Sequence, residues 1–396
     1  MTGWGWVAVW GRGYWVVGLA GRGWGPAIVA AVERVDVAVV GSGLMGSAAA
    51  RALGGRGVQT VLLEQFGLGH ARGSSHGATR IFRFTYPDPG YVRMALLARE
   101  KWLRLEEDAG QELLVTTGGL DAGPDARPCA AALSECGVRH SWLVEGELRE
   151  RFPQVMAGPG EEMLLQPDAG VLLAGRAVAA MQELARRDGV SIRERAPVLG
   201  FEPRGERVLL RTAAGEISAR VAVVAAGGWN GPLLAGVVPR VPRLRVTLQQ
   251  ISYFSPCLGS GWPTFIESQE GRPTWYTVPA AGEAPGIKVA SHAPGRVVDP
   301  GAGPFEPTDA ELAAEAELYV RQRLPGLDPA GFGAETCLYT ITDDEDFVVD
   351  RVGPVVVGGG GSGHAFKFGP LLGEMLADLA MGHEPAVPRD RFSLSR

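Results

Sequence analysis

Three glycines follow a short apolar run closely enough to form a phosphate-binding turn. Gly41, Gly43 and Gly46 form G-S-G-L-M-G directly after Val35–Val40 and before the alanine-rich stretch Ser47–Leu53. This order predicts a strand, a tight turn and a helix, with a diphosphate at the helix N-terminus. Gly41 then permits the turn, Gly43 lets the backbone approach the ligand, and Gly46 lets the helix pack on the strand.

A carboxylate follows these glycines at the spacing expected for a residue that binds the ribose of a dinucleotide. Thr60–Leu63 predicts a second strand, and Glu64 ends it about 20 residues beyond the glycines, where it can accept hydrogen bonds from ribose hydroxyls. NAD and FAD both use this fingerprint. Arg220–Gly228 and Val355–Gly363 predict two later buried strands that end in small residues, and such returns to a nucleotide domain favour FAD. A glycine-rich loop in an unrelated α/β protein is the alternative.

Lysine is rare in this chain and occurs only at Lys101, Lys288 and Lys367, although Lys and Arg together number 38. Arginine is always charged, whereas the pKa of a lysine can shift when its side chain is buried. A site that keeps a lysine therefore calls for a chemical explanation.

The composition sets limits on the class of protein. With 396 residues, 46% of them hydrophobic and 21% charged, the chain is too long for one ordinary core and predicts two domains. A net charge of −6 makes nucleic acid an unexpected partner. The 4 cysteines show neither C-x-x-C spacing nor the density of a disulfide scaffold, so we expect a reducing cytoplasm and no metal site.

Met1–Ala31 differs from the rest of the chain because it is rich in Gly and Trp and lacks sustained periodicity. It is too interrupted for a secretory signal or a transmembrane helix. Our preferred interpretation is an artefact of the start site, with translation beginning at Val32. The alternative is a genuine tail that touches a membrane or a partner. Mass spectrometry of the native protein distinguishes the two.

The middle of the chain predicts a second, mixed sheet. Arg176–Arg187 has the spacing of an amphipathic helix, and Ser191–Val223 predicts a strand meander. Strands of the second sheet are predicted at Val246–Phe254, Trp275–Val278 and Ile287–Ala290. Thr308 and Glu311 form a capping box that predicts a helix ending near Leu324.

The predicted fold class is therefore α/β, a Rossmann-type FAD-binding domain interleaved with a mixed-sheet substrate domain. We expect residues 1–34 to lie outside the fold. The predicted FAD-binding domain comprises 35–90, 170–235 and 335–396, and the predicted substrate domain comprises 91–169 and 236–334.

Four segments together resemble the family of monomeric sarcosine oxidase and N-methyltryptophan oxidase, which also includes pipecolate oxidases. They are G-S-G-L-M-G, G-S-S-H-G-A-T-R-I-F-R from Gly73, C-L-Y-T-I-T-D-D-E-D-F-V-V-D from Cys337, and G-S-G-H-A-F-K-F from Gly361. The resemblance spans about Val35 to Arg396. It implies a two-domain flavin fold, oxidation of a secondary amino acid at a carbon–nitrogen bond, and reoxidation by oxygen.

Cys337 matches the position at which this family binds FAD covalently through a thioether. Such attachment requires a thiolate, and a neighbouring positive charge would favour it by lowering the pKa of the thiol. The alternative is a small buried core cysteine.

His76, Arg80 and Arg83 match a motif that places a histidine and two arginines near the flavin and the substrate. Arg83 is the residue we expect to pair with a substrate carboxylate, because a guanidinium can grip it with two parallel hydrogen bonds. The alternative is a solvated arginine. The family commonly has two adjacent histidines, and here the first is replaced by Ser75, which leaves the substrate open.

The resemblance also gives roles to two of the three lysines. Lys367 matches a second carboxylate-binding residue, beside the turn Gly358–Gly363. Lys288 matches the lysine that activates oxygen, where a fixed ammonium would stabilise developing negative charge. An ordinary surface lysine is the alternative for Lys367.

The fingerprint and the resemblance together give two sets of site residues. Cofactor contacts are expected at Gly41, Gly43, Gly46, Glu64, Ser75, His76, Arg80, Val198, Cys337, Gly363, His364 and Lys367. Catalytic or substrate contacts are expected at Lys288, Arg83, Lys367, Tyr339, His292 and Tyr276.

The resemblance implies an oxidase, expected to be monomeric, that converts an N-methyl or cyclic secondary amino acid to an imine and hydrogen peroxide, and the cysteine usage predicts that it is cytoplasmic. Its partners would be a small amino acid and oxygen, with FAD bound through Cys337 and no membrane contact. One alternative is a tailoring oxidase that desaturates an amino-acid-derived biosynthetic intermediate, and another is a flavin-binding protein without catalysis.

Overall fold

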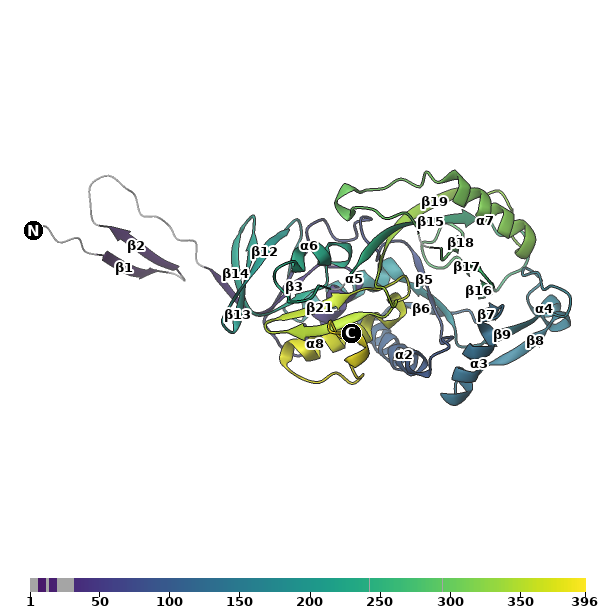
Figure 1. Cartoon of the computed structure of the whole chain (residues 1–396), viewed down its shortest axis with the longest axis horizontal. Helices are drawn as coiled ribbons and strands as arrows, with labels where there is room; N and C mark the ends of the chain where they lie inside the picture. The colour runs from purple at the N-terminus through teal and green to yellow at the C-terminus, as the bar shows by residue number, and fades with distance from the viewer. Residues whose placement is uncertain (1–5, 12–13, 20–31, 242, 294) are drawn as a thin grey trace, which may run out of the picture.

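The computed structural model of the chain describes residues 6–11, 14–19, 32–241, 243–293 and 295–396. Two eight-stranded sheets organise residues 33–396, and a three-stranded sheet lies with them (Figure 1). The mixture of parallel and antiparallel strands with covering helices confirms the predicted α/β class.

The first large sheet has the order β11-β4-β3-β14-β13-β12, and β21 pairs with both β14 and β20. Its strands are β3 (Glu33–Val40), β4 (Thr60–Leu63), β11 (Ser191–Arg193), β12 (Val198–Arg204), β13 (Arg207–Thr212), β14 (Gly215–Val224), β20 (Val348–Val352) and β21 (Val355–Gly359). Strands β11, β4, β3, β14 and β21 are parallel. Valines point to both faces of β3, and both faces are buried, as is typical of a parallel strand covered on two sides.

Most of the predicted elements of this sheet are confirmed. The second strand has the predicted bounds, and β12, β13 and β14 form most of the antiparallel meander predicted over Ser191–Val223. The first part of that stretch, β11, instead pairs in parallel with β4. The first strand begins at Glu33, two residues before the predicted boundary, because β14 starts early enough for Ile217 to pair with Glu33.

The second large sheet has the order β19-β15-β18-β17-β16-β7-β9-β8, antiparallel except between β16 and β7. Its strands are β7 (Gly119–Ala122), β8 (Ser141–Val144), β9 (Glu162–Gln166), β15 (Arg245–Phe254), β16 (Thr264–Gln269), β17 (Arg272–Val278), β18 (Ile287–Ser291) and β19 (Gly333–Ile341). Strand β19 carries Cys337 and pairs with β15 along its whole length. Residues 335–341 therefore lie in the second sheet, whereas the sequence assigned them to the FAD-binding domain.

Strands β5 (Thr79–Phe82), β10 (Gly170–Leu173) and β6 (Leu114–Thr116) form the small antiparallel sheet. The helices are α1 (Leu44–Gly54), α2 (Pro89–Ala109), α3 (Ala126–Glu135), α4 (Glu145–Arg151), α5 (Ala174–Arg187), α6 (Asn230–Leu234), α7 (Ala310–Arg323) and α8 (Gly369–Met381). The N-cap of α7 is Asp309, which accepts from the amide of Leu312, and not the predicted Thr308.

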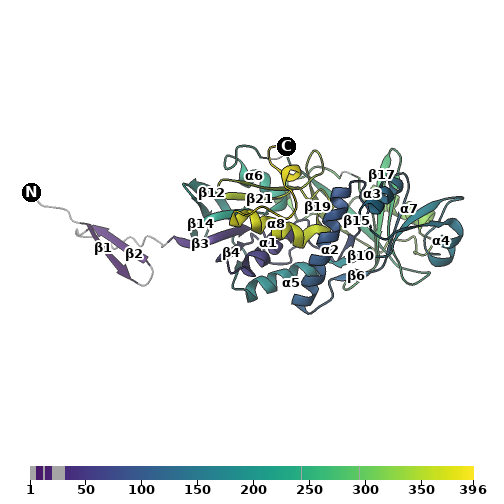
Figure 2. The ribbon, with the colours of Figure 1, turned by 90° about the horizontal axis from the view of Figure 1, so that it is seen from below.

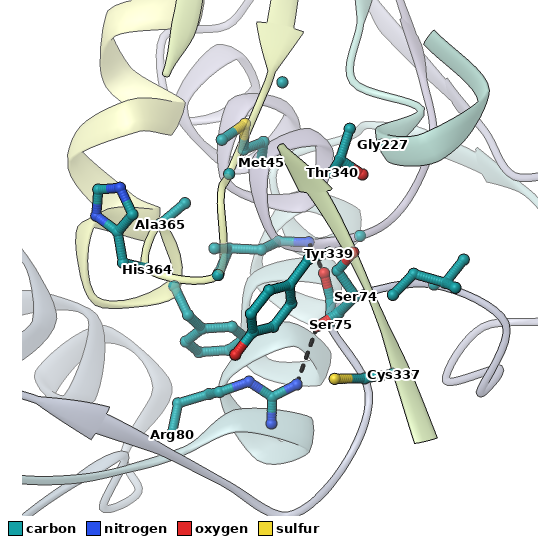
Figure 3. A pocket seen from close by; sticks show the side chains of 18 of the residues that line it. Met45, Ser74, Ser75, Arg80, Gly227, Cys337, Tyr339, Thr340, His364 and Ala365 are labelled. Atoms are coloured by element: carbon teal, nitrogen blue, oxygen red, sulfur yellow. Dashed lines mark hydrogen bonds between the residues drawn. The ribbon is translucent and has the colours of Figure 1, made fainter. Parts of the chain in front are cut away.

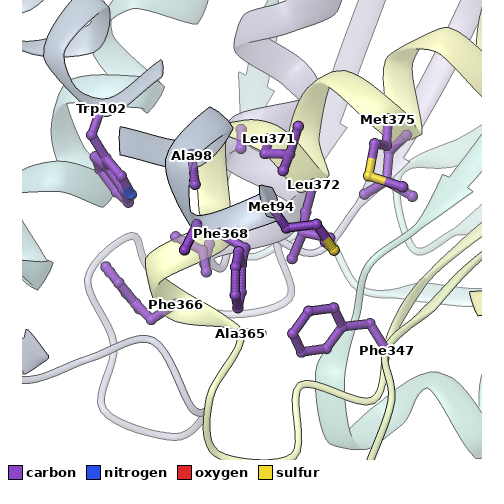
Figure 4. Packing of buried hydrophobic residues seen from close by; sticks show 14 of the residues in the cluster. Met94, Ala98, Trp102, Phe347, Ala365, Phe366, Phe368, Leu371, Leu372 and Met375 are labelled. Carbon is purple, nitrogen blue, oxygen red and sulfur yellow. The ribbon is translucent and has the colours of Figure 1, made fainter. Parts of the chain in front are cut away.

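Helices α1, α2, α5 and α8 pack beside one another (Figure 2). Side chains of α2 interlock with Phe366, Phe368 and α8 in the main hydrophobic core (Figure 4). Trp102 of α2 stacks on Phe366 and donates from Nε1 to the carbonyl oxygen of Lys367 at 2.7 Å. This core fixes the backbone that carries Lys367, although α2 lies within the predicted substrate-domain segment 91–169.

The close contact predicted for Gly46 is present, and it predicts that a larger residue there destabilises the fold. A Cβ atom at Gly46 would lie 1.8 Å from the carbonyl oxygen of Gly41, so either α1 or the turn would have to move. We expect Gly46→Ala to lower the free energy of unfolding by about 3 kcal/mol. Urea titration measures this change.

Gly55→Ala is the matched control because Gly55 caps the other end of α1 with a φ of −60°. Its added Cβ would meet no atom closer than 3.5 Å. Equal stability losses in the two variants would contradict the close-packing role of Gly46.

At the N-terminal end, β1 (Trp6–Gly11) and β2 (Tyr14–Leu19) form an antiparallel pair that joins no other described strand. The start-site interpretation of Met1–Ala31 stays a prediction, because most of this stretch lies outside the described residues. Within the described part of the chain, none of the helices combines the length and apolar character that crossing a membrane requires.

Candidate active site

A cavity of about 1160 Å³ runs between the two large sheets. Ligand pockets for drug-sized molecules span roughly 300 to 1,000 Å³, so this central cavity can take a large ligand together with a small one. Residues from the glycine turn after β3, the segment 73–91, β17, β18, β19 and the turn after β21 line it. The folded chain thus brings together segments that lie far apart in sequence.

The glycine turn forms one end of the central cavity. Gly41 has a φ of +96°, and a Cβ there would lie 2.6 Å from the carbonyl oxygen of Ala225. The Oγ of Ser75 accepts from the amide of Leu44 at the start of α1 and lies where a Cβ of Gly43 would come within 3.1 Å. Ser75 therefore contacts the phosphate-binding turn, and the departure at this position changes the cofactor end of the cavity.

Glu64 lies at the same end, at the carboxyl end of β4. Its Oε2 accepts from the amide of Ser42 at 2.8 Å and its Oε1 from the amide of Phe66 at 2.9 Å. Burial raises the pKa of Glu64, but hydrogen bonds with His70 and these two amides outweigh burial and hold the pKa below its usual value. The group is thus an ionised acceptor, as ribose hydroxyls require.

Cys337 lies in the middle of the cavity, on β19, with Arg80 pointing into the same space (Figure 3). Arg80 donates to the carbonyl oxygens of Thr79, Ser74 and His76 at 2.8, 2.9 and 2.7 Å. Burial raises the pKa of the Cys337 thiol, while the positive charges of Arg80 and Lys288 act in the opposite direction. Burial outweighs these charges, so the pKa of the thiol lies above its usual value, although the cationic neighbours that would favour a thiolate are present.

Lys288 is 3% exposed, and its Nζ donates to the carbonyl oxygen of Thr79 at 3.1 Å. Burial, followed by the charge of Arg80, lowers the pKa of Lys288 to about 7. Burial also lowers the pKa of His76 to about 4, assisted by the charges of Arg80 and Lys288. Lys288 is thus buried in the same cavity as the thiol.

Arg83 lies farther along the cavity, beyond β5. Its Nη1 donates to the carbonyl oxygen of Thr85 at 2.6 Å and to Thr85 Oγ1 at 3.0 Å. The same atom lies 3.6 Å from Oδ1 of Asp121, a buried carboxylate. The structure gives no partner to Nε or Nη2 of Arg83 within the described ranges, so this edge of the guanidinium is available to a ligand.

Lys367 is 5% exposed and reaches the same part of the cavity from the segment before α8. Its Nζ donates to the hydroxyl of Tyr86 and to the carbonyl oxygen of His364, each at 2.8 Å. Burial, and then the charge of Arg83, hold the pKa of Lys367 well below its usual value. Burial also lowers the pKa of His364 to about 3, and its Nδ1 lies 3.1 Å from the Tyr86 hydroxyl.

His292, Tyr339 and Gly363 meet on one side of the cavity. The His292 and Tyr339 rings lie 5.5 Å apart, and a Cβ at Gly363 would come within 2.5 Å of the tyrosine. Burial lowers the pKa of His292 to about 4 and raises that of Tyr276, which interacts with Tyr339, to about 12. These groups are therefore neutral at physiological pH.

The residues fit a dinucleotide with a flavin ring. A side chain at Gly41 or Gly46 would collide with the backbone, so glycine is needed for the tight turn that faces the cavity, and Glu64 presents an ionised acceptor beside it. Three polar atoms that line the middle of the cavity, His76 Nε2, Thr79 Oγ1 and Thr340 Oγ1, are buried without a hydrogen-bond partner in the described chain. Such atoms are those that a polar ring system could satisfy.

All but one of the predicted site residues line this single cavity; Gly46 instead lies in the packing contact between α1 and β3. Three further residues of the site, Tyr86, Thr85 and Asp121, were not predicted from the sequence. Tyr86 lies three residues beyond Arg83, just outside the motif that runs from Gly73 to Arg83. No pattern in the sequence marks Asp121, because a lone acidic residue in a short strand is common.

The sequence matches the family model described as FAD dependent oxidoreductase over residues 36–379. It is 35% identical over 377 residues to the monomeric sarcosine oxidase of Streptomyces avermitilis, covering 91% of this chain and 97% of that protein. It is 33% identical over 375 residues to the peroxisomal sarcosine oxidase of Homo sapiens, covering 91% of this chain and 96% of the human protein.

The fold is also similar to that of a solved amino acid oxidase. NikD, described as an unusual amino acid oxidase essential for nikkomycin biosynthesis, superimposes with a TM-score of 0.83 at 26% identity. The superposition covers 91% of this chain and 98% of NikD.

Proposed function

Since the chain belongs to the family of FAD-dependent oxidoreductases and acts on a CH–NH group with oxygen as acceptor, we propose that its substrate is a secondary amino acid. An N-methyl amino acid such as sarcosine or N-methyltryptophan, or a cyclic one such as pipecolate, would be converted to an imine and hydrogen peroxide. The imine would hydrolyse in water. The FAD requirement and the amino acid oxidase class follow from the family, and the substrate is the proposal.

One observation carries this proposal: Arg83, Lys367, Lys288 and Cys337 all line the cavity that begins at the nucleotide fingerprint. Arg83 and Lys367 would bind the substrate carboxylate, which orients the amine toward the centre of the cavity. The neutral His292, Tyr276 and Tyr339 would surround the amine and exclude water. FAD accepts the electrons of the carbon–nitrogen bond when bound, and Lys288 would stabilise negative charge that develops on oxygen.

A panel of secondary amino acids tests the proposal. Peroxide release with sarcosine, N-methyltryptophan, pipecolate or proline, measured with a coupled peroxidase, is the expected result. Primary amino acids of the same size serve as controls. Peroxide from glycine or alanine but from no secondary amino acid would contradict the proposed substrate class.

A second candidate function is a tailoring oxidase that desaturates a biosynthetic intermediate. The similarity to NikD favours it, because that amino acid oxidase is essential for nikkomycin biosynthesis. Ser75 gives this candidate no support, since the side chain contacts the cofactor end of the cavity. Turnover of a cyclic substrate with no turnover of sarcosine would favour this candidate.

We further propose that FAD is bound covalently through Cys337, with Arg80 and Lys288 as the neighbouring charges that favour a thiolate. The expected result is that flavin colour stays with the acid-denatured wild-type chain and enters the supernatant with Cys337→Ser. Cys129→Ser is the matched control, because Cys129 lines the same cavity, with its pKa raised by burial to about 12, but the charges that act on it are those of Arg83 and two carboxylates. Release of all flavin from the wild-type chain would contradict covalent attachment.

The remaining expectations are also proposals. The relative from Streptomyces avermitilis is named a monomeric oxidase and has a similar length, which supports a monomer. The four cysteines are unpaired in the described fold, which supports a reducing compartment such as the cytoplasm.

A further inference from the structure

Asp121 is a buried carboxylate in the central cavity that the proposed chemistry does not use. It lies on β7 in the second sheet, and its side chain is 7% exposed. Burial raises its pKa above the usual value, and the charge of Arg83 and the hydrogen bonds from Thr85 and Gln166 offset only part of that rise. A buried carboxylate is costly to retain unless its neighbours stabilise it.

The two hydrogen-bonding neighbours of Asp121 both donate to it. Gln166 Nε2 donates to Oδ2 at 2.6 Å, and its Oε1 accepts from the amides of Phe84 and Thr85 at 2.9 and 3.1 Å, which fixes the amide orientation. Thr85 Oγ1 accepts from Gln166 Nε2 and Arg83 Nη1, so its own proton points to Oδ1 of Asp121 at 2.9 Å. Each oxygen of Asp121 thus accepts a hydrogen bond from a group that has no other way to place that proton, an arrangement that stabilises the carboxylate form.

Thr85 and Asp121 act on Arg83 in different ways, as their distances from Nη1 show. Thr85 holds Nη1 at 2.6 and 3.0 Å, which are hydrogen-bond lengths, whereas Asp121 Oδ1 lies 3.6 Å from Nη1. Thr85 therefore sets the orientation of the guanidinium. Asp121 acts on Arg83 mainly through its charge.

We propose that Asp121 is the internal counter-ion of Arg83 and sets how tightly the site holds a carboxylate. The inference rests on the proposed role of Arg83 in binding the substrate carboxylate. In the empty cavity Asp121 offsets the charge of Arg83, and a substrate carboxylate that binds the Nε–Nη2 edge must share the guanidinium with it. Asp121 thereby weakens carboxylate binding and favours release of a carboxylate product.

This role predicts a gain of binding. Asp121→Asn removes the competing charge while the two Thr85 contacts still hold Arg83, so the flavin-loaded variant should bind acetate about tenfold more tightly. Titration of the visible absorption of the bound cofactor with acetate gives the dissociation constant without turnover. The KM for the accepted amino acid should fall in the same direction.

A purely structural role would produce the opposite result, because damage to the site does not tighten binding. Unchanged or weaker acetate binding in folded, flavin-loaded Asp121→Asn would overturn the inference. Asp125→Asn is the matched control: Asp125 also lines the cavity but makes no contact with Arg83 in the described structure, and its variant should bind acetate as the wild type does.

A second measurement covers the case in which the amide of the Asp121→Asn variant cannot keep both hydrogen bonds and the variant fails to fold. In a crystal structure of the wild-type holoenzyme with acetate, Arg83 Nη1 should remain beside Asp121 and Thr85 while acetate binds the other edge. A guanidinium turned away from Asp121 would overturn the inference. Absence of both acetate binding and amino acid oxidation in the wild type would instead contradict the proposed function.

Discussion

Lys288→Met is expected to slow the reaction of the reduced enzyme with oxygen by about 100- to 1,000-fold, while reduction by the amino acid changes only a few-fold. The reason is that the buried Lys288 amine, held by the carbonyl oxygen of Thr79 at 3.1 Å, supplies a positive charge in its protonated form, and methionine keeps the shape without the charge. Stopped-flow mixing of pre-reduced enzyme with oxygen measures this step alone. Equal slowing of both half-reactions would contradict the role.

The chain offers a natural control for this substitution. Lys101 pairs with Glu374 outside the cavity, so Lys101→Met should leave both half-reactions unchanged.

The pH dependence follows from the same group. Burial and the charge of Arg80 lower the pKa of Lys288 to about 7, while Cys337 and Glu335 act in the opposite direction. The cationic form dominates below that pH, so the oxygen reaction of the wild type should slow as pH rises through about 7. The rate in Lys288→Met should be flat over the same range.

Arg83→Ala is expected to raise the apparent KM for the amino acid by about 100-fold, because two charge-assisted hydrogen bonds to the carboxylate are lost. Removal of Arg83 also leaves Asp121 as an unpaired buried charge that repels a carboxylate. The double variant Arg83→Ala/Asp121→Asn should therefore recover part of the loss. Steady-state kinetics of the two variants measure both effects.

The control for Arg83→Ala is Arg176→Ala, since Arg176 pairs with Glu283 at the surface and does not line the cavity. An Arg83→Ala enzyme with a normal KM and a low kcat would contradict carboxylate binding by this arginine.

The nucleotide-binding half of the fold could be predicted because local rules determine it. Alternating and continuous apolar runs gave β3, β4 and the meander, and the glycine spacing gave the turn and α1. The sequence placed residues 335–341 in the predicted FAD-binding domain and did not predict strand β19, because its partner, β15, is set by tertiary pairing about 90 residues away. The choice of Thr308 as N-cap was wrong because Asp309 competes for the same role and accepts from Leu312.

Only part of the candidate site could be predicted from the sequence. Glycines, a carboxylate and two rare lysines could be selected from the sequence, and all except Gly46 line one cavity. Tyr86 and Asp121 could not be selected, because their importance lies in contacts with Lys367 and Arg83 that only the folded chain creates.

If this cavity couples a bound FAD to a secondary amino acid and then to oxygen, anaerobic reduction followed by exposure to air shows both steps directly. The flavin-loaded enzyme is mixed anaerobically with sarcosine, and in parallel with N-methyltryptophan, pipecolate and proline, and then exposed to air. We predict that at least one of these bleaches the visible absorption of the flavin, and that air restores the absorption with release of one peroxide per flavin. A spectrum unchanged by every one of them, in protein that retains FAD, would contradict the account.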